Sequence, residues 1–253
     1  MSEALITGAS SGLGRALARE LASRYGVTVT LAARRRARLA ELASEIIDAG
    51  GQARVLPLDV SDGAATAAAI RALDGRVGGL DLVIANAGAG PAADTAASYS
   101  FEALAEPLQV NLVGAAATLC AALPAMVARG RGHLVGICSL SSFGALPDAA
   151  PYCVPKAGLS MLLDCLRLDV AAHGVDVTTV NAGFIRTEMV AARAVRGDAM
   201  PQLLEVDDAA RRIATALARR PAVIDLPQPL ALGARALAAL PRPLRDRLLR
   251  RGR

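Results

Sequence analysis

Two spacings of apolar residues alternate along this chain. Short, nearly unbroken apolar runs are separated by longer Ala-rich stretches in which apolar residues recur every three or four positions. The short runs predict buried strands, and the longer stretches predict amphipathic helices between them. The predicted strands lie at 4–7, 27–33, 53–58, 80–85, 133–138 and 175–181. This alternation predicts an α/β fold, in which helices cover both faces of a parallel sheet.

The alternation loosens after residue 181. Segment 183–204 carries few strand signals, which predicts a lid over a substrate; an ordinary surface connection is the alternative. A helical stretch at 207–220 and a weak strand at 222–226 follow. We therefore expect one domain over 1–226 and a helical extension over 227–253.

The extension has an unusual pattern of charge. An apolar helix is predicted at about 230–240, and leucines then recur at helical spacing among the arginines of 244–253. A basic amphipathic helix of this kind can lie on an anionic membrane surface, and it can equally pack its Leu face on its own body or on a partner subunit. The sequence leaves these alternatives open for residues 242–253.

Composition narrows the class of protein. Residues 234–253 hold seven Arg and one Asp, so the net charge of +5 comes from the extension and the remainder is near neutral. Aromatic residues make up 2% of the chain and Trp is absent, which disfavours a base-stacking surface for nucleic acid. The four cysteines form no CxxC pair and only two histidines accompany them, so we expect no metal site and reduced thiols.

Two segments bear on the location of the protein. The first residues show no basic and apolar secretory signal, so we expect a cytoplasmic protein. The uncharged stretch 110–128 approaches the length of a membrane span, but it contains Asn111 and Pro124. It therefore favours a buried helix.

A Gly-rich turn, Thr7-Gly8-Ala9-Ser10-Ser11-Gly12-Leu13-Gly14, stands between the first predicted strand and a helix. Glycines there let the backbone approach a pyrophosphate, and a helix N-terminus presents free N–H groups to an anion. This position predicts a dinucleotide site formed by Gly8, Ser10, Ser11, Gly12, Leu13 and Gly14. A turn that only packs the helix on the sheet is the alternative.

Lys156 is the only lysine among 28 basic residues, and it follows Tyr152 by four positions. Residues at this spacing share one face of a helix. A compact ammonium beside a phenol favours the phenolate, which suits acid/base chemistry near neutral pH, whereas Arg is a wide fork that stays protonated. Pro151 and Pro155 fit only if the helix begins at this point. A surface lysine on a helix is the alternative to a catalytic pair.

The motifs together resemble the short-chain dehydrogenase/reductase family over about residues 4–190. They include Asn86-Ala87-Gly88 after the fourth strand and Ser139, which stands 13 residues before Tyr152. The resemblance implies a Rossmann-like, doubly wound parallel sheet of seven strands in three layers. It implies a nicotinamide cofactor and reversible hydride transfer to or from a small carbonyl or alcohol substrate. It also implies a homodimer or homotetramer joined through the helices at 107–129 and 152–173.

The resemblance assigns catalytic roles to Asn111, Ser139, Tyr152 and Lys156. Tyr152 would exchange a proton with the substrate oxygen, which Ser139 would hold. Lys156 would hold the nicotinamide ribose. Asn111 would support a water linked to the lysine, or would satisfy backbone groups at a helical kink.

Two segments depart from the family pattern. The family has a Gly three residues after the serine, whereas here Gly144 follows Ser139 by five, so Ser141 and Ser142 compete for its role. After the sixth strand the family usually reads Asn-Pro-Gly, but this chain has Asn181-Ala182-Gly183. Loss of the proline predicts a looser turn.

The resemblance also assigns cofactor contacts outside the Gly-rich turn, namely Asp59, Val60, Asn86, Ala87, Gly88, Tyr152, Lys156, Ile185 and Thr187. Enzymes selective for NAD(H) place an acidic residue at the end of the second strand, but here Ala33 stands there, followed by Arg34. This predicts NADP(H) rather than NAD(H), with Arg34 and Ser10 on the 2′-phosphate. A solvated basic start of a helix is the alternative.

The sequence thus predicts an NADP(H)-dependent oxidoreductase that acts on an apolar carbonyl or alcohol. A dinucleotide-binding regulatory protein without turnover and a membrane-peripheral scaffold are the alternatives. The complete catalytic set disfavours the first of these, because a protein without turnover need not keep all four residues.

Overall fold

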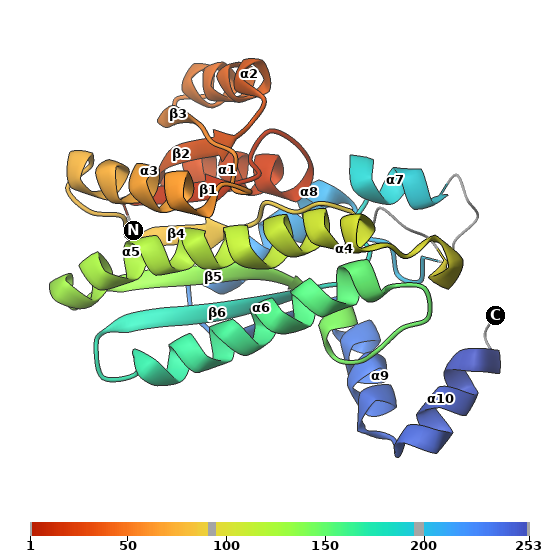
Figure 1. Ribbon diagram of the computed structural model, residues 1–253. Helices are drawn as coiled ribbons and strands as arrows, with labels where there is room; N and C mark the ends of the chain where they lie inside the picture. The colour runs from red at the N-terminus through yellow and green to blue at the C-terminus, as the bar shows by residue number, and fades with distance from the viewer. Residues whose placement is uncertain (1, 91–94, 195–199, 252–253) are drawn as a thin grey trace.

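The computed structural model describes residues 2–90, 95–194 and 200–251. Seven parallel strands form one sheet in the order β3-β2-β1-β4-β5-β6-β7 (Figure 1). Their bounds are β1 Glu3–Thr7, β2 Thr28–Ala33, β3 Ala53–Pro57, β4 Leu82–Ala85, β5 Gly132–Ser139, β6 Val175–Ala182 and β7 Val223–Leu226. The seven predicted strands, including the weak one at 222–226, are confirmed.

Helices cover both faces of the sheet (Figure 1). One face carries α1 Gly12–Tyr25, α2 Arg36–Asp48 and α8 Val206–Leu217, and the other carries α3 Gly63–Arg76, α5 Ala115–Arg129 and α6 Ala150–Asp169. Each layer buries its own apolar core against the sheet, with Leu17, Leu39 and Ile213 in one core and Ile70 and Leu119 in the other. The predicted three-layer, doubly wound fold is therefore confirmed.

The strand order changes direction between β1 and β4. From β1 the sheet continues to β2 and β3, whereas from β4 it continues to β5, β6 and β7 on the other side. Connections leave the carboxyl ends of β1 and β4 in opposite directions at such a point, which opens a crevice beyond the strands. The residues that directly follow the strands are thus the ones placed to line it.

One long helix of three parts runs over residues 101–129. The parts are α4 Phe101–Leu108, a π-helical turn Gln109–Gly114, and α5. By length and apolar composition this helix could cross a membrane, but α5 packs on β4 and β5 with Leu119 and Met126 fully buried. The uncharged stretch 110–128 thus lies in a core-facing helix, as the sequence predicts.

Helix α6 begins at Ala150, which places Pro151 in its first turn but Pro155 inside the helix. The prediction that both prolines mark the helix start is therefore correct only for Pro151. Pro155 has no N–H to donate to the carbonyl four residues earlier. Its ring is buried in the fold, and this tertiary packing overrides the local cost.

An apolar stripe runs along the outer face of α6. It consists of Val154, Ala157, Met161, Cys165 and Leu168, which recur every three or four residues. All five are exposed, Leu168 to 68%. A continuous apolar strip at this spacing is typical of a helix face that another helix covers. We call it the α6 stripe.

The chain ends in α9 Gln228–Ala239 and α10 Arg242–Arg251. Arg235 anchors α9 to the body, because its guanidinium pairs with Asp225 at 3.0 Å and lies 4.2 Å from the ring centroid of Phe143. In α10, Leu244 and Leu248 are about half exposed. Helices therefore occupy the region that the sequence assigns to the extension.

His133 is a fully buried titratable group in β5. Thr178 donates its hydroxyl proton to the carbonyl of Pro221, so the ring donates from Nε2 to Thr178 Oγ1 at 2.8 Å. Nδ1 has no hydrogen-bond partner among the described residues. Burial, aided by the positive charge of Arg220, lowers the pKa of His133 from 6.5 to about 4. The folded protein therefore keeps this imidazole neutral.

We expect mild acid to destabilise the fold through His133. Between pH 6.5 and about 4 the unfolded chain binds a proton there that the folded chain does not, so the free energy of unfolding falls as the pH drops. This one group accounts for about 3 kcal/mol of the loss. Denaturant titrations at both ends of this range measure it. His133→Gln has no group that titrates at this position, so its free energy of unfolding should fall less than that of the wild type when the pH drops from 6.5 to about 4. An equal fall in both proteins would show that His133 is not the group responsible.

Candidate active site

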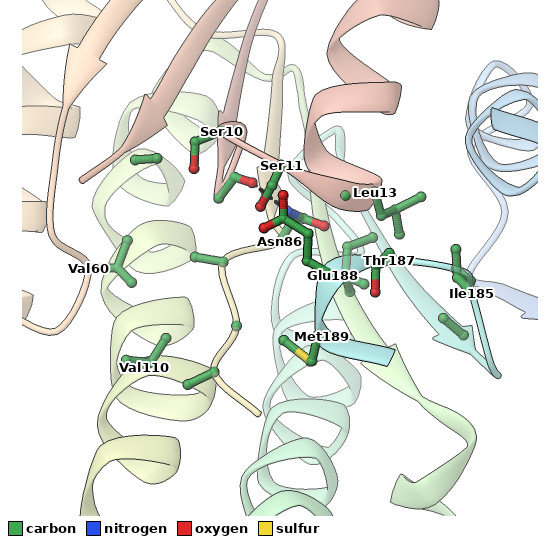
Figure 2. Close-up of a pocket in the computed structure, with 18 of the residues that line it drawn as sticks. Ser10, Ser11, Leu13, Val60, Asn86, Val110, Ile185, Thr187, Glu188 and Met189 are labelled. Carbon is green, nitrogen blue, oxygen red and sulfur yellow. Dashed lines mark hydrogen bonds between the residues drawn. The ribbon is translucent and has the colours of Figure 1, made fainter. Parts of the chain in front are cut away.

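A cavity of about 300 Å³ opens in the crevice between β1 and β4. Its walls come from the segments after β1, β2, β3, β4 and β6, from the end of β5, from the start of α6 and from the long helix. Figure 2 shows the parts contributed by the segments after β1, β3, β4 and β6 and by Val110 of the long helix. Of the predicted site residues, the walls include Gly8, Ser10, Ser11, Gly12, Leu13, Arg34, Asp59, Val60, Asn86, Ala87, Gly88, Tyr152, Lys156, Ile185 and Thr187. The fold thus brings most of the predicted residues to one cavity.

The Gly-rich turn packs directly on the loop after β4. Gly8 has a φ of +68°, and a Cβ there would lie 2.7 Å from Ala87 Cα. A Cβ on Gly14 would overlap the side-chain amide of Asn86. Both positions therefore require glycine. Gly14 is not among the described residues that line the cavity, and its role is this close packing.

Hydrogen bonds hold the same two loops together. The Thr7 hydroxyl accepts from the N–H groups of Asn86 and Ala87 at 3.1 and 3.2 Å, and Asn86 Nδ2 donates to the Thr7 carbonyl at 2.9 Å. Within the described part of the chain, Ser11 at the N-cap of α1 makes no side-chain capping bond. The first N–H groups of α1 are therefore available to an anion in the cavity.

A positively charged rim borders the Gly-rich turn. Arg35 donates to Ser10 Oγ at 2.9 Å and to Ser11 Oγ at 2.7 Å. The sequence predicts that Arg34 and Ser10 bind the 2′-phosphate, which stays a prediction; in the structure it is Arg35 that contacts the Ser10 hydroxyl. Successive side chains at a strand end point in different directions, so only one of the two arginines faces the turn.

Arg34 also lines the cavity wall, and its charge acts on Asp59. The backbone N–H and the hydroxyl of Ser61 donate to Asp59 Oδ1 at 3.0 and 2.8 Å, and they lower the pKa of this carboxyl, with a further contribution from the charge of Arg34. Asp59 is therefore held as a carboxylate acceptor at the predicted adenine end of the cavity.

Tyr152 and Lys156 both line the cavity from the start of α6. Lys156 is 5% exposed, and its Nζ donates to the carbonyl of Ile137 at 2.8 Å. The same Nζ lies 5.9 Å from the centroid of the Tyr152 ring. Since a buried ammonium needs a polar partner, the bond to Ile137 holds the lysine in place and ties α6 to β5. The spacing of four thus places both residues on one side of the helix.

Ser139 is the last residue of β5 and is 9% exposed. Its Oγ accepts from the N–H of Ser141 at 3.2 Å, and its carbonyl accepts from Ser142 Oγ at 2.6 Å. It is not among the described residues that line the cavity, whereas its neighbour Cys138 is. Ser141 and Ser142 thus bind to Ser139 and shape the turn around it.

Asn111 lies in the π-helical turn and is fully buried. Its Oδ1 accepts from the N–H of Ala89 at 2.8 Å, and its Nδ2 donates to the carbonyl of Ala89 at 3.0 Å. These bonds join the long helix to the loop after Gly88. They correspond to the second role considered from the sequence, in which Asn111 satisfies backbone groups. The support of a water linked to Lys156 stays a prediction.

The turn after β6 is held in the sheet. Ala182 pairs with Leu226 of β7, and the N–H of Gly183 donates to the Leu226 carbonyl at 2.7 Å. Asn181 Nδ2 donates to Asp225 Oδ1 at 2.8 Å. Pairing with β7 thus restrains the backbone at this turn, and the looser turn expected from loss of the proline stays a prediction.

Sequence reasoning missed several residues of the cavity wall, among them Arg35, Cys138, Glu188 and Met189. Burial raises the pKa of the Cys138 thiol to about 12, so this thiol stays protonated. Glu188 and Met189 begin α7 Glu188–Ala194, inside the predicted lid. Their position directly after Thr187, a predicted cofactor contact, is the signal that could have identified them. Residues 195–199 of the predicted lid lie outside the described residues.

The chain matches known proteins over most of its length. A family model described as short chain dehydrogenase matches residues 2–196. An uncharacterized oxidoreductase from Myxococcus xanthus is 44% identical over 248 residues, which cover 98% of this chain and 96% of that protein.

Solved structures show the same likeness. A short-chain dehydrogenase from Sphingobium yanoikuyae in complex with NADPH has a TM-score of 0.80 at 27% identity, over 96% of this chain and 97% of that one. An alcohol dehydrogenase from Thermococcus sibiricus, complexed with 5-hydroxy-NADP, has a TM-score of 0.78 at 28% identity, over 89% of this chain and 95% of that one.

Proposed function

Because this chain belongs to the short-chain dehydrogenase/reductase family of oxidoreductases, we propose that it transfers a hydride between NADP(H) and a carbonyl or alcohol group of a small substrate. The pair of Tyr152 and buried Lys156 on the cavity wall carries this proposal. A phenol with an ammonium 5.9 Å from its ring centroid is suited to exchange a proton with a substrate oxygen.

The cavity fits a nicotinamide dinucleotide. At Gly8 the backbone comes so close to the loop after β4 that no Cβ has room, and the free N–H groups of α1 and the guanidinium of Arg35 stand at the same end. The N–H groups of α1 would hold the pyrophosphate, and Arg35 would hold a 2′-phosphate. When bound, such a cofactor supplies or accepts the hydride.

The protein's own residues would handle the proton. In reduction Tyr152 would donate its phenolic proton to the carbonyl oxygen, and in oxidation it would take the proton from the alcohol. Lys156 places a positive charge beside the phenolate that remains. Ser139 directly follows Cys138 of the cavity wall, and from there it would donate a hydrogen bond to the substrate oxygen as negative charge develops. Met189 and Val190 on the cavity wall favour an apolar substrate.

Three features support NADP(H) over NAD(H). Ala33 ends β2 where an acidic residue would bind the ribose hydroxyls. Arg35 and the Ser10 hydroxyl offer donors to a 2′-phosphate, and Arg34 adds a second positive charge on the cavity wall. The two similar structures described above are complexed with NADPH and with 5-hydroxy-NADP.

Tyr152→Phe should abolish turnover and leave cofactor binding unchanged, since it removes only the hydroxyl that exchanges the proton. We expect kcat/KM to fall at least about 100-fold. Absorbance of NADPH with a panel of ketones and aldehydes measures turnover, and fluorescence titration measures binding. Unchanged turnover would refute Tyr152 as the acid/base. A wild-type protein that binds NADPH but reduces no member of the panel would favour the regulatory alternative.

Arg35→Ala should weaken NADPH binding by about tenfold or more and leave NADH binding unchanged, because a charged hydrogen bond to the 2′-phosphate is lost. Arg36→Ala is the matched control: Arg36 is an exposed arginine next in the chain and is not among the described residues of the cavity wall. Titrations with both cofactors give the affinity ratio. If Arg34→Ala changes this ratio and Arg35→Ala does not, the sequence-based assignment holds instead.

We also propose that the α6 stripe is buried between two copies of this chain. Met161, at its centre, is 65% exposed, and Phe101 and Val113 on the neighbouring long helix are exposed as well. Met161→Arg should convert a dimer into a monomer in light scattering, because a charge cannot be buried unpaired. Leu232→Arg, on α9 and 68% exposed, should leave the dimer intact. A wild-type monomer, or equal effects of both variants, would contradict the interface.

The location of the protein stays a prediction from sequence. The comparisons give no support to membrane contact through 242–253, so the amphipathic pattern of α10 also stays a prediction.

A further inference from the structure

Glu188 connects two distant parts of the cavity wall. It is the first residue of α7, and its Oε1 accepts from Arg38 Nη1 at 3.1 Å while its Oε2 lies 3.7 Å from Arg35 Nη1. Arg35 and Arg38 belong to the N-cap and first turn of α2, about 150 positions earlier in the chain. Figure 2 shows Glu188 pointing from α7 toward Ser11 of the Gly-rich turn. One carboxylate thus spans the cavity wall from the predicted lid to α2.

The guanidinium of Arg35 interacts with two hydroxyls and one carboxylate. It donates to the hydroxyls of Ser10 and Ser11 and at the same time faces the Glu188 carboxylate. Two hydroxyls and one guanidinium that face an anion form an anion-binding site. In this structure the anion is a side chain of the protein itself.

A phosphate monoester is a stronger ligand than a carboxylate for such a site. It carries a charge of about −1.5 to −2 and three acceptor oxygens, whereas a carboxylate carries one charge and two oxygens. Glu188 is 62% exposed, so solvent screens its pairing with the arginines and limits its strength. The Glu188 carboxylate therefore pairs with Arg35 and Arg38, and a phosphate that binds Arg35 would displace it.

We propose that Glu188 occupies the 2′-phosphate position beside Arg35 and is displaced by that phosphate when NADP(H) binds. This inference rests on the proposed function. It makes Glu188 a determinant of cofactor specificity that opposes the 2′-phosphate, and it couples arrival of that phosphate to release of α7 from α2. A cofactor without the 2′-phosphate leaves the pair of Glu188 and Arg35 in place.

Glu188→Gln tests the proposal with adenosine 2′,5′-bisphosphate and 5′-AMP as probes, alongside NADPH and NADH. Without the competing charge, the bisphosphate and NADPH should bind about fivefold tighter, the size expected for loss of a screened ion pair. The affinities for 5′-AMP and NADH should not change. Calorimetric titration of the full chain measures all four.

Glu205→Gln is the matched control. Glu205 is a 65% exposed carboxylate that pairs with Arg186 at 2.8 Å, near the same segment, and neither residue is among the described ones of the cavity wall. This variant should bind every probe as the wild type does.

Three outcomes would overturn the proposal. If Glu188→Gln matches Glu205→Gln for NADPH while the wild type binds NADPH, the displacement is absent although the proposed function stands. If Glu188→Gln tightens 5′-AMP and NADH equally, Glu188 repels the cofactor as a whole and does not occupy the 2′-phosphate position. If the wild type binds neither NADPH nor the bisphosphate, the NADP(H) assignment fails together with this inference.

Discussion

The close contact between the turn after β1 and the loop after β4 is the constraint on which the site depends. At Gly8 the two backbones approach too closely for a Cβ, and the Thr7 hydroxyl accepts from two N–H groups of the opposite loop. This contact sits where the strand order changes direction, so it forms the floor of the crevice. It also places the N-terminus of α1 at the cavity, where its N–H groups would meet the pyrophosphate of the proposed cofactor.

A second restraint joins α6, which carries the proposed acid/base Tyr152, to the sheet. Lys156 is buried, and its bond to the carbonyl of Ile137 satisfies the ammonium at β5, the strand that ends in Ser139. Removing a charge from water is costly, so such a lysine is retained only where a partner holds it. The same bond keeps the ammonium beside the Tyr152 ring. Packing of α6 on β5 therefore serves both stability and the proposed proton exchange.

Charge around the cavity is arranged unevenly. Arg34 and Arg35 line one end together with Asp59 and Glu188, whereas Tyr152 and Lys156 stand at the start of α6. We propose that the arginines meet a phosphorylated cofactor and that Met189 meets an apolar substrate. The proposed oxidoreductase thus separates cofactor recognition from substrate chemistry along one cavity, with α7 in contact with both parts.

The strands, the helices and the two motifs could be read from sequence, because apolar periodicity and the spacing of four between Tyr152 and Lys156 are local properties. Which of two adjacent residues of the same type makes a given contact could not be read from the sequence. Arg34 and Arg35 are chemically identical, and only the direction of the chain beyond β2 decides which one meets Ser10. Pro155 remains helical because burial outweighs local preference. The pairing of Glu188 with Arg38 joins residues 150 positions apart, and no periodicity of the chain encodes a contact that arises only when α7 and α2 border the same cavity.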